Sequence, residues 1–479
     1  MDVLLVNPHY NGRSEIPPLG LECLAAILME HEVTVHILDL DIVPRPDADK
    51  SLERQLRTQC PKIVGVTAMS NSFDAAVTAC RTTKSVNPDT LTVMGGIHPT
   101  VLYDAIMERH GEVDLVVRGE GEFTFLDVTQ CYFRNIPFNG IAGISFRGRN
   151  SITHNGEREL IRNLDSLPLP AHTLVRNDVY RTRSISSSRG CFHTCTFCSI
   201  QSLYHNVVRL RTIKSITDEI EGLITCGAKR IMFTDDNFTF SFKRIRQLCE
   251  EIIRKELNRK AVFYAEGRID DICNAPIMAQ ILSDAGFRGL YIGAESGSEE
   301  ILNYYRKGIT PDVIYRGVTY CIEQNLSPIV NFILYGPNDT VATIKETIQL
   351  AKKLFENGSE IVYAETLTPY PGTPIKEELE EDGKFRESRG VFYFESYRDL
   401  DIDWIMQLCN AARDIAYLIH RNDPLFISRK AYYELTYLDE LLDRKIPVDF
   451  EQYCHSKTDE GNTLNEVRNT YECIQQLFH

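Results

Sequence analysis

The sequence of 479 residues predicts an α/β protein with two strand–helix regions followed by a helical region. Short apolar runs alternate with helical patterns in residues 1–125, a second alternating series starts near residue 183, and only amphipathic helical patterns follow residue 380. These observations predict an N-terminal doubly wound sheet of the Rossmann or flavodoxin type, a partial (β/α)6 barrel of the TIM type, and a helical C-terminal domain. The predicted boundaries are 1–130 for the first domain, 131–178 for a connector, 179–385 for the barrel and 386–479 for the helices.

The first region contains five apolar runs with polar, glycine-containing turns after most of them. Between the first two runs, the stretch LGLECLAAILMEH repeats its apolar residues with the period of a helix. The turns NPHYNG, TAMSNS, GGIHPT and RGEGE follow strands, and the carboxyl ends of parallel strands are where such sheets bind ligands. The predicted strands are residues 3–6, 33–38, 63–68, 91–96 and 114–122.

The second region repeats this organisation after a connector that contains a hairpin pattern, GISFRGRNSITHNGE, and a proline-rich stretch, LDSLPLPAHTL. Six strands with polar residues at their ends predict a partial barrel whose site lies at the carboxyl ends. The predicted strands are residues 183–190, 230–237, 262–268, 289–296, 329–336 and 360–372.

The C-terminal region begins with an amphipathic helix around residues 401–423. Its apolar stripe consists of Ile405, Leu408, Cys409, Ala412, Ile415, Ala416 and Ile419. Four aromatic residues of this region either line a substrate channel or simply pack, and both interpretations stay open: Trp404, Tyr432, Tyr433 and Tyr437.

Composition excludes several classes of function. A formal net charge of −15 disfavours sequence-independent nucleic-acid binding, which relies on basic surfaces. No apolar run is long enough for a membrane helix, and the start MDVLLVNPHYNG lacks the pattern of a signal peptide, so we expect a soluble, cytoplasmic protein. Eleven of the 14 cysteines are scattered and are expected to be reduced thiols.

The other three cysteines stand close together in SSSRGCFHTCTFCSI, as Cys191, Cys195 and Cys198. A structural zinc ion needs four protein ligands, and His193 is the fourth ligand of the zinc alternative. Three thiolates that hold a four-iron cluster would instead leave one iron open to chelate a substrate and pass it one electron. We therefore expect a [4Fe-4S] cluster at these three residues.

This spacing, C-x3-C-x2-C after the first barrel strand with an aromatic residue before the last cysteine, strongly resembles the radical S-adenosylmethionine (SAM) superfamily. The segments FTDDNFT, AEGRID, YIGAESGSEEIL and LTPYPGTP match that superfamily's later barrel strands. The resemblance implies that the chain binds SAM. The SAM-binding residues that it implies are Phe197, Asp235, Asp236, Arg268, Glu295 and Ser296.

The N-terminal region resembles the cobalamin-binding domain of cobalamin-dependent radical SAM enzymes in LLVNPHY, PPLGLECLAAIL, GGIHPT and RGEGE. The resemblance covers residues 1 to about 380 and implies cobalamin as a further cofactor; the alternative is a flavodoxin-like domain whose glycines only make turns. The chain lacks the Asp-x-His-x-x-Gly segment whose histidine binds cobalt from below, so we expect Met69, Asn71 or Phe73 beneath the cobalt and His98 at the cofactor's periphery. The cobalamin-binding residues that the resemblance implies are Asn7, Met69, Ser70, Asn71, Gly95, Gly96, His98, Gly119 and Glu120.

The resemblance is strongest to the members that methylate carbon. It implies an enzyme, a radical SAM C-methyltransferase, in which one SAM methylates cobalt to give methylcobalamin. A second SAM yields a 5′-deoxyadenosyl radical that removes hydrogen from an unactivated carbon. Such a site must exclude water and oxygen, so anaerobic operation is expected.

Several alternatives use the same features of the sequence. A cyclase or ring-rearranging oxidoreductase would need the same cofactors, and a cobalamin sensor would leave the SAM motifs unused. Methylthio transfer to tRNA is disfavoured by the acidity of the chain. The substrate, a protein or peptide or a small molecule, is not specified by any motif, and an electron donor such as ferredoxin or flavodoxin is the expected partner.

Overall fold

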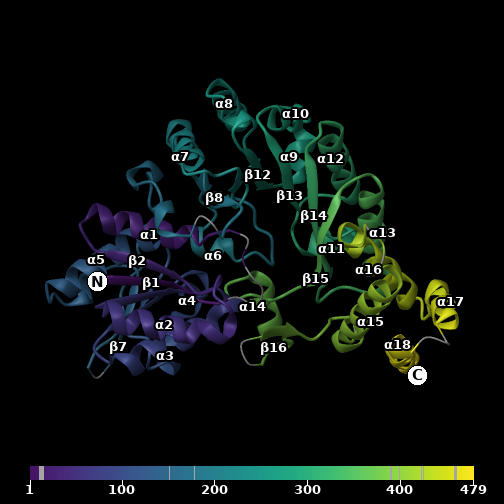
Figure 1. Cartoon of the computed structure of the whole chain (residues 1–479), viewed down its shortest axis with the longest axis horizontal. Coiled ribbons are helices and arrows are strands. Elements are labelled where there is room, and N and C mark those ends of the chain that lie inside the picture. Colours follow the sequence, from purple (N-terminus) through teal and green to yellow (C-terminus); the bar gives the residue numbers. More distant parts are fainter. Residues whose placement is uncertain are drawn as a thin grey trace.

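The computed structural model describes residues 1–9, 14, 16–149, 151–176, 179–388, 391–398, 400–421, 423, 425–457 and 461–478. Three regions follow one another from left to right in Figure 1: an N-terminal sheet with its helices, a curved second sheet, and a group of C-terminal helices. This order confirms the predicted fold class, with a Rossmann-like parallel sheet, a partial barrel and a helical end.

The N-terminal sheet has seven strands in the order β2-β1-β3-β4-β5-β6-β7. The first five strands are parallel, as predicted, and the chain changes direction beside β1, which lies between β2 and β3. The strands are β1 (Val3–Asn7), β2 (Val35–Asp39), β3 (Ile63–Thr67), β4 (Leu91–Gly95) and β5 (Leu115–Val117). The helices are α1 (Leu19–Glu30), α2 (Arg45–Gln59), α3 (Phe73–Val86), α4 (Ile97–Arg109) and α5 (Gly121–Phe133).

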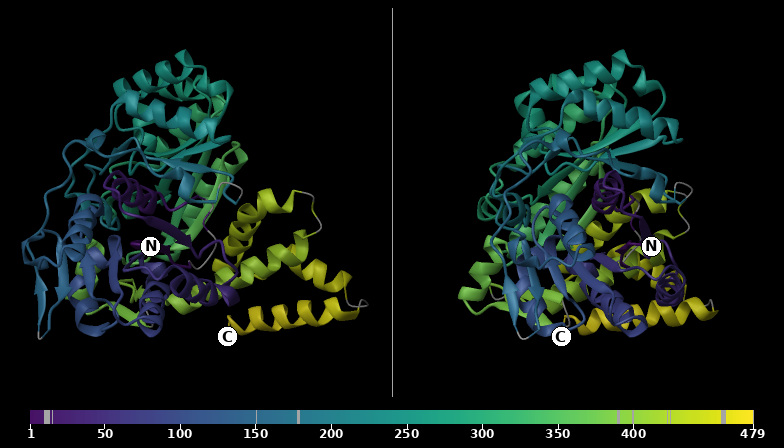
Figure 2. Two further views of the ribbon diagram at one scale, coloured as in Figure 1. Left: turned by 60° about the vertical axis from the view of Figure 1, so that its left-hand side comes forward. Right: turned by 90° about the vertical axis from the view of Figure 1, so that its left-hand side faces the viewer.

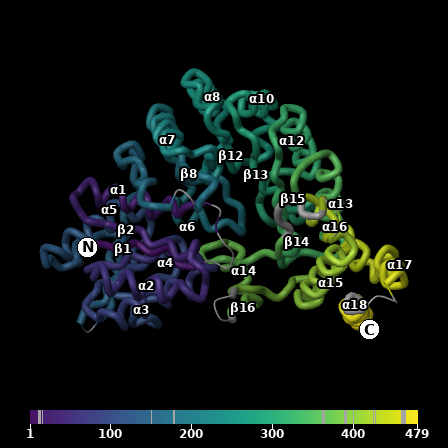
Figure 3. Tube along the Cα trace, viewed as in Figure 1, coloured from purple at the N-terminus to yellow at the C-terminus, as the bar shows by residue number. Residues whose placement is uncertain are grey.

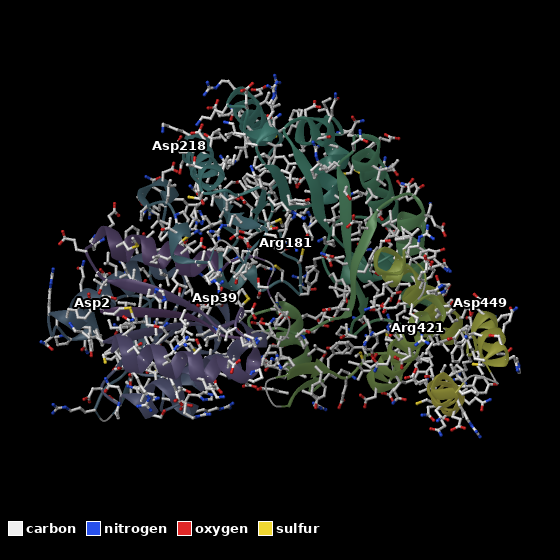
Figure 4. All side chains as sticks on the ribbon, viewed as in Figure 1. Asp2, Asp39, Arg181, Asp218, Arg421 and Asp449 are labelled. Atoms are coloured by element: carbon white, nitrogen blue, oxygen red, sulfur yellow. The ribbon has the colours of Figure 1, made fainter. Side chains whose placement is uncertain are left out.

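Apolar layers cover both faces of this sheet. Leu21, Leu28 and Phe125 of α1 and α5 pack on one face, and Leu52 and Ile106 of α2 and α4 pack on the other. The strands therefore read as continuous apolar runs because both faces are buried. Figure 4 labels Asp2, before β1, and Asp39, at the end of β2, and places Asp39 nearer the middle of the molecule. The carboxyl ends of the strands thus face the second sheet.

The hairpin pattern of the predicted connector forms β6 (Ile144–Arg147) and β7 (Ile152–His154), which extend the N-terminal sheet in antiparallel fashion. The hairpin was expected from its sequence, and its pairing with β5 was not. Strand β5 is shorter than the predicted run 114–122 because Gly119 turns the chain at φ +73° and α5 begins at Gly121.

The second sheet contains the six predicted strands, all parallel, in the order β15-β14-β13-β12-β11-β8. It curls into a partial barrel with helices on its outer side (Figures 1 and 2). The strands are β8 (Arg183–Ile185), β11 (Arg230–Phe233), β12 (Val262–Gly267), β13 (Phe287–Glu295), β14 (Ser327–Tyr335) and β15 (Glu360–Thr366). The covering helices are α7 (Ile213–Thr225), α8 (Phe242–Arg254), α9 (Ile269–Asn274), α10 (Ile277–Asp284), α11 (Glu299–Tyr304), α12 (Pro311–Glu323) and α13 (Val341–Glu356).

Short elements surround the cysteine loop. Strand β9 (Ser188–Arg189) pairs with β10 (Arg209–Leu210), and α6 (Ile200–Tyr204) follows the last cysteine. Helix α14 (Pro374–Glu381) and the hairpin of β16 (Phe385–Ser388) and β17 (Val391–Phe394) follow the barrel. In Figure 3, this segment lies between the N-terminal region and the C-terminal helices. Phe392 packs near His98 of the first region, with ring centroids 6.2 Å apart.

The C-terminal region is helical, as predicted, with α15 (Ile402–His420), α16 (Phe426–Leu442), α17 (Val448–Ser456) and α18 (Gly461–Gln476). Helix α16 contacts α13 and β15, so these helices share one apolar core with the barrel. Tyr433 stacks on His420 at 3.7 Å, Tyr437 is buried, and Tyr432 hydrogen-bonds Glu356, so these aromatic residues pack. Within the part of the chain that the structure describes, no helix is long and apolar enough to span a membrane.

Candidate active site

The three clustered cysteines lie on the loop that follows β8, at the carboxyl end of the partial barrel. Main-chain hydrogen bonds hold this loop on the barrel: Thr196 N–H donates to Tyr305 O at 3.0 Å, and Ile375 N–H donates to Thr196 O at 3.0 Å. The Gln201 amide also donates to Cys195 O at 2.7 Å. Residues that follow β13 and β15 therefore hold the loop in place.

The environment of the cysteines fits thiolates that are bound to a metal cluster. Burial raises the pKa of Cys191 and raises that of Cys198 to about 11, so both thiols are protonated near neutral pH without a cation to stabilise the thiolate. No three His, Cys, Asp or Glu side chains among the described residues converge closely enough for a single metal ion. Cysteines that each bind a different iron of a cluster stand further apart than the ligands of a single metal ion.

Asp235 and Asp236, which follow β11, have different surroundings. Asp235 is buried, and its carboxylate accepts hydrogen bonds from Ser187 N–H at 2.9 Å, Ser187 Oγ at 2.6 Å and Ser188 Oγ at 2.5 Å. The structure therefore places it as a support for the cysteine loop. Asp236 accepts one hydrogen bond from Gly190 N–H at 2.7 Å and lines the cavity between the two sheets.

Burial raises the pKa of Asp236 to about 6. The hydrogen bond from Gly190 N–H opposes this rise, and the neighbouring charge of Asp235 adds to it. A cationic ligand beside Asp236 would lower that pKa and stabilise the carboxylate. SAM carries such a cation, so Asp236 fits the predicted role better than Asp235.

Arg268, at the end of β12, joins the cysteine loop to the barrel. Its guanidinium lies 3.9 Å from Cys195 Sγ and donates to Asp270 at 3.0 and 3.1 Å and to Lys307 O at 2.6 Å. The Phe197 ring packs edge-on against Tyr305, with centroids 5.3 Å apart, and Lys307 Nζ lies 6.0 Å from the Phe197 ring. Both predicted residues thus lie beside the cysteines.

His193 also lies in this loop. Burial lowers its pKa to about 4, and the positive charges of Arg268 and Lys307 contribute to this, so the imidazole is neutral. Its Nε2 atom is buried and makes no hydrogen bond within the described part of the chain.

Glu295 ends β13 in a left-handed conformation with φ +64°, which is strained for a non-glycine residue. Its Oε1 accepts a hydrogen bond from Lys307 Nζ at 2.7 Å. A Cβ on Gly293 would lie 2.2 Å from the same oxygen, so a larger residue there would displace the Glu295 carboxylate. Ser296, by contrast, is fully buried and bonds Thr347 Oγ1 at 2.9 Å and Ser298 N–H at 3.0 Å, which is a role in packing.

Glu266, on β12, is a site residue that the motifs did not identify. Its neighbours Phe263 and Ala265 belong to the outer core, so the alternation of the strand points Glu266 into the barrel. The side chain is accessible to solvent there, but desolvation by the surrounding protein, and then the charges of Asp236 and Asp235, raise its pKa to about 7. Its position one residue before Gly267 in AEGRID was the only signal in the sequence.

A cavity of about 440 Å³ lies between the carboxyl ends of the N-terminal strands and the loops after β8 and β11. Apolar residues of α1, β3, β4 and β5 form one wall, and Ser188, Arg189, Tyr204 and Asp236 form the other. Gly95, Gly96 and Gly119, which the resemblance implies for cobalamin, also line this cavity. At Gly96, φ is +111° and a Cβ would lie 2.5 Å from Ala68 O, so only glycine fits.

The loop after β3 lies at the same end of the sheet. Met69 is half exposed and lines both this cavity and a second one of about 220 Å³, which Ser70, Asn71 and His98 also line. His98 is buried, its Nδ1 lies 3.0 Å from Ser70 Oγ, and burial lowers its pKa to about 4. The imidazole is therefore neutral and already engaged through one nitrogen.

The remaining predicted cobalamin residues have partners of their own. Asn7 is buried at the end of β1 and donates from Nδ2 to Asp39 Oδ1 at 2.9 Å, while its Oδ1 makes no hydrogen bond within the described residues. Glu120 lines the cavity, and both its oxygens form ion pairs with arginines of the barrel region. Glu120 thus contacts the other region directly.

Comparison with known families agrees with this architecture. Residues 11–129 match the B12 binding domain, and residues 185–351 match the radical SAM superfamily. The fold and the site therefore define a radical SAM enzyme with an added B12 binding domain.

Among curated proteins, an uncharacterized methyltransferase of Pyrococcus horikoshii is 30% identical over 368 residues, which cover 75% of this chain and 78% of the relative. The chain belongs to the cobalamin-dependent radical SAM methyltransferase family. An anaerobic magnesium-protoporphyrin IX monomethyl ester cyclase of Cereibacter sphaeroides is 26% identical over 416 residues, 83% of this chain and 66% of that one. The hopanoid C-3 methylase of Methylococcus capsulatus is 24% identical over 373 residues, 75% of this chain and 68% of that one.

One solved structure shares the fold over the whole chain. The radical SAM methyltransferase TsrM from Kitasatospora setae, determined with cobalamin and a [4Fe-4S] cluster bound, has a TM-score of 0.71 and 19% identity. The match covers 100% of this chain and 99% of that one. The cofactors predicted from the sequence, cobalamin, SAM and a [4Fe-4S] cluster, are those of this family.

Proposed function

We propose that this enzyme transfers a methyl group to an unactivated carbon of its substrate. The observation that carries the proposal is the cavity of about 440 Å³, whose wall joins the glycine-lined strand ends of the B12 binding region to the cysteine loop of the barrel. Two cofactors that share one cavity suit a reaction at a carbon with no lone pair. The hopanoid relative, which is named a C-3 methylase, supports carbon as the acceptor.

The residues present fit the three cofactors. Cys191, Cys195 and Cys198 supply three soft donors, and the Nε2 atom of His193 in the same loop has no hydrogen-bond partner within the described residues. At Gly119, which lines this cavity, a Cβ would meet no atom within 4 Å, so the strand ends are open there to a large ligand. Asp236 supplies a carboxylate with a raised pKa where a cationic ligand would bind.

When bound, the cluster and SAM supply a hydrogen-abstracting radical, and cobalamin supplies the methyl group. The chain's own residues position these groups and exclude water. Asp235 holds Ser187 and Ser188, which precede the cysteines, and Arg268 holds the loop from the other side through Cys195. Glu266, with a pKa of about 7, can hold or release a proton inside the barrel near neutral pH.

The charge of the chain bears on its substrate, and its cluster bears on its partner. We propose a protein, peptide or small molecule as acceptor rather than nucleic acid, because the formal net charge is −15. An acidic, one-electron carrier such as ferredoxin or flavodoxin would reduce the cluster. All 14 cysteines are free, which suits the cytoplasm, where thiols stay reduced.

The test is anaerobic incubation of the reconstituted enzyme, a chemical reductant and SAM with a deuterated methyl group. Extract from cells that lack the gene would supply the substrate. We expect a metabolite or peptide that gains the deuterated methyl at carbon, together with 5′-deoxyadenosine. A product that is oxidised or cyclised and carries no deuterium would refute methyl transfer and support the cyclase alternative, to which the Cereibacter relative points.

A further inference from the structure

A group of buried ion pairs connects the B12 binding region to the cysteine loop. Glu120 and Glu122 stand at the start of α5, and Arg189 and Arg209 belong to the paired strands β9 and β10. Arg189 Nη1 donates to Glu120 Oε1 at 2.7 Å, and Arg189 Nη2 donates to Glu122 Oε1 at 2.5 Å. Arg209 Nη1 donates to Glu120 Oε2 at 2.5 Å. We name these four residues the Arg189 clamp.

The clamp is enclosed by protein. The side chains of Glu120 and Glu122 are only 5% and 7% exposed, and those of Arg189 and Arg209 are 17% and 6% exposed. Buried pairs of this kind add little net stability, but they fix the geometry of the groups that they join.

The clamp lies between the two places where cofactors are expected. Glu120, Glu122 and Arg189 line the cavity at the strand ends of the first region. Arg189 is two residues before Cys191, and Gly190 between them donates its N–H to Asp236 at 2.7 Å. A shift of Arg189 would therefore move the cysteine loop and the Asp236 contact together.

Resting on the proposed function, we propose that Arg189 is a positioning residue that sets the separation of the cluster from the cobalamin. The planar guanidinium meets one carboxylate with each of two nitrogens, and a lysine ammonium cannot reproduce this fork. A small displacement of reacting groups can lower a rate by about a hundredfold. Through the position of the cysteine loop, Arg189 thus acts on the coupling between radical formation and methyl transfer.

The test uses the full-length Arg189→Lys variant, loaded with the cluster and cobalamin. Asp127→Asn is the matched control, because Asp127 lies on the same helix α5 and pairs with Arg158 at 2.7 Å without reaching the barrel. Iron and cobalamin content are measured first. Electron paramagnetic resonance then measures the dipolar interaction between Co(II) and the reduced cluster, which depends on their separation and needs no substrate.

We expect both variants to keep wild-type iron and cobalamin content. Arg189→Lys should change or broaden the dipolar interaction, and once a substrate is available it should yield about tenfold less methylated product per 5′-deoxyadenosine. An unchanged dipolar interaction in Arg189→Lys, or an equal change in Asp127→Asn, would overturn the inference. Failure of the proposed function looks different: the wild-type protein itself would lack a bound Co(II) signal or make no methylated product.

Discussion

His172 forms a second buried polar contact between the two regions, and it makes a sharp prediction about pH. Its Nδ1 lies 2.6 Å from Glu22 Oε2 on α1, and its Nε2 lies 2.9 Å from Glu219 Oε1 on α7. Burial alone lowers the pKa of His172, but the hydrogen bonds to Glu219 and Glu22 reverse this and raise it to about 9. The protonated imidazole therefore bridges a helix of each region.

The sign and size of the effect follow from this pKa. An unfolded chain gives histidine a pKa of 6.5, and the folded protein raises it to about 9. Because the folded value is higher, the stabilisation is fully present below about pH 6.5 and disappears as the pH rises through 9. At about 1.4 kcal/mol for each pKa unit, the contact contributes about 3 kcal/mol at low pH. The loss should amount to about 1.4 kcal/mol for each pH unit within that window.

The measurement is the free energy of unfolding in urea between pH 6 and pH 10, for the wild type and for His172→Gln. Glutamine can still hydrogen-bond both carboxylates, but it cannot be protonated. We expect the variant to be less stable by about 3 kcal/mol at pH 6 and nearly equal to the wild type at pH 10. His154→Gln is the control, because His154 contacts the hydroxyl of Ser145 at 2.9 Å. A difference between wild type and His172→Gln that does not vary with pH would refute the reasoning.

Three further outcomes test the cofactor sites. Replacing Cys195 by alanine should prevent cluster assembly and 5′-deoxyadenosine formation but leave cobalamin bound; a full iron complement in the triple variant of Cys191, Cys195 and Cys198 would show that the cluster lies elsewhere. Asp236→Asn should weaken SAM binding by about tenfold in equilibrium dialysis, the loss expected for one charge-assisted contact, with the cluster spectrum unchanged; equal affinity would return Asp236 to a structural role. Cobalamin in the Co(II) state should show no strong nitrogen splitting from an axial ligand, and a three-line pattern that disappears in His98→Ala would identify His98 as the lower ligand.

The fold could be predicted largely because each strand is a local pattern. Both faces of the central strands are buried, so runs such as residues 63–68 are apolar throughout, and their spacing reveals the helices between them. The pairing of the β6–β7 hairpin with β5 depends on contacts between distant segments, and periodicity does not report these. The β16–β17 hairpin was missed because it is short, and its strands lie in a region where helical patterns dominate.

The site was predictable where the chemistry depends on close spacing. The predicted residues lie in the loops that follow barrel strands. Arg268 contacts Cys195, Phe197 lies in the cysteine loop itself, and Asp236 lines the cavity between the two sheets. Asp235 matched the same pattern as Asp236, but only the fold shows that its oxygens are bonded to Ser187 and Ser188.

Partners separated by many residues left no signal in the sequence. His172 meets Glu22 and Glu219, which lie 150 and 47 residues away along the chain. Glu266 was overlooked for another reason: a single carboxylate in a strand is ordinary, and only its surroundings in the fold, with Asp236 and Asp235 nearby, give it a pKa of about 7.

Charge, more than apolar area, aligns the two cofactor-binding regions at these contacts. Hydrophobic attraction is non-directional, so an apolar contact lets two surfaces slide over one another. A carboxylate that must meet a guanidinium fork, or an imidazole held between two carboxylates, tolerates little displacement. The His172 contact joins α1 to α7, and the Arg189 clamp joins α5 to the cysteine loop. Helices α1 and α5 cover the same face of the N-terminal sheet, so the two contacts together prevent both translation and rotation of that face relative to the barrel. An enzyme that must bring two cofactors together needs that restriction more than it needs additional stability.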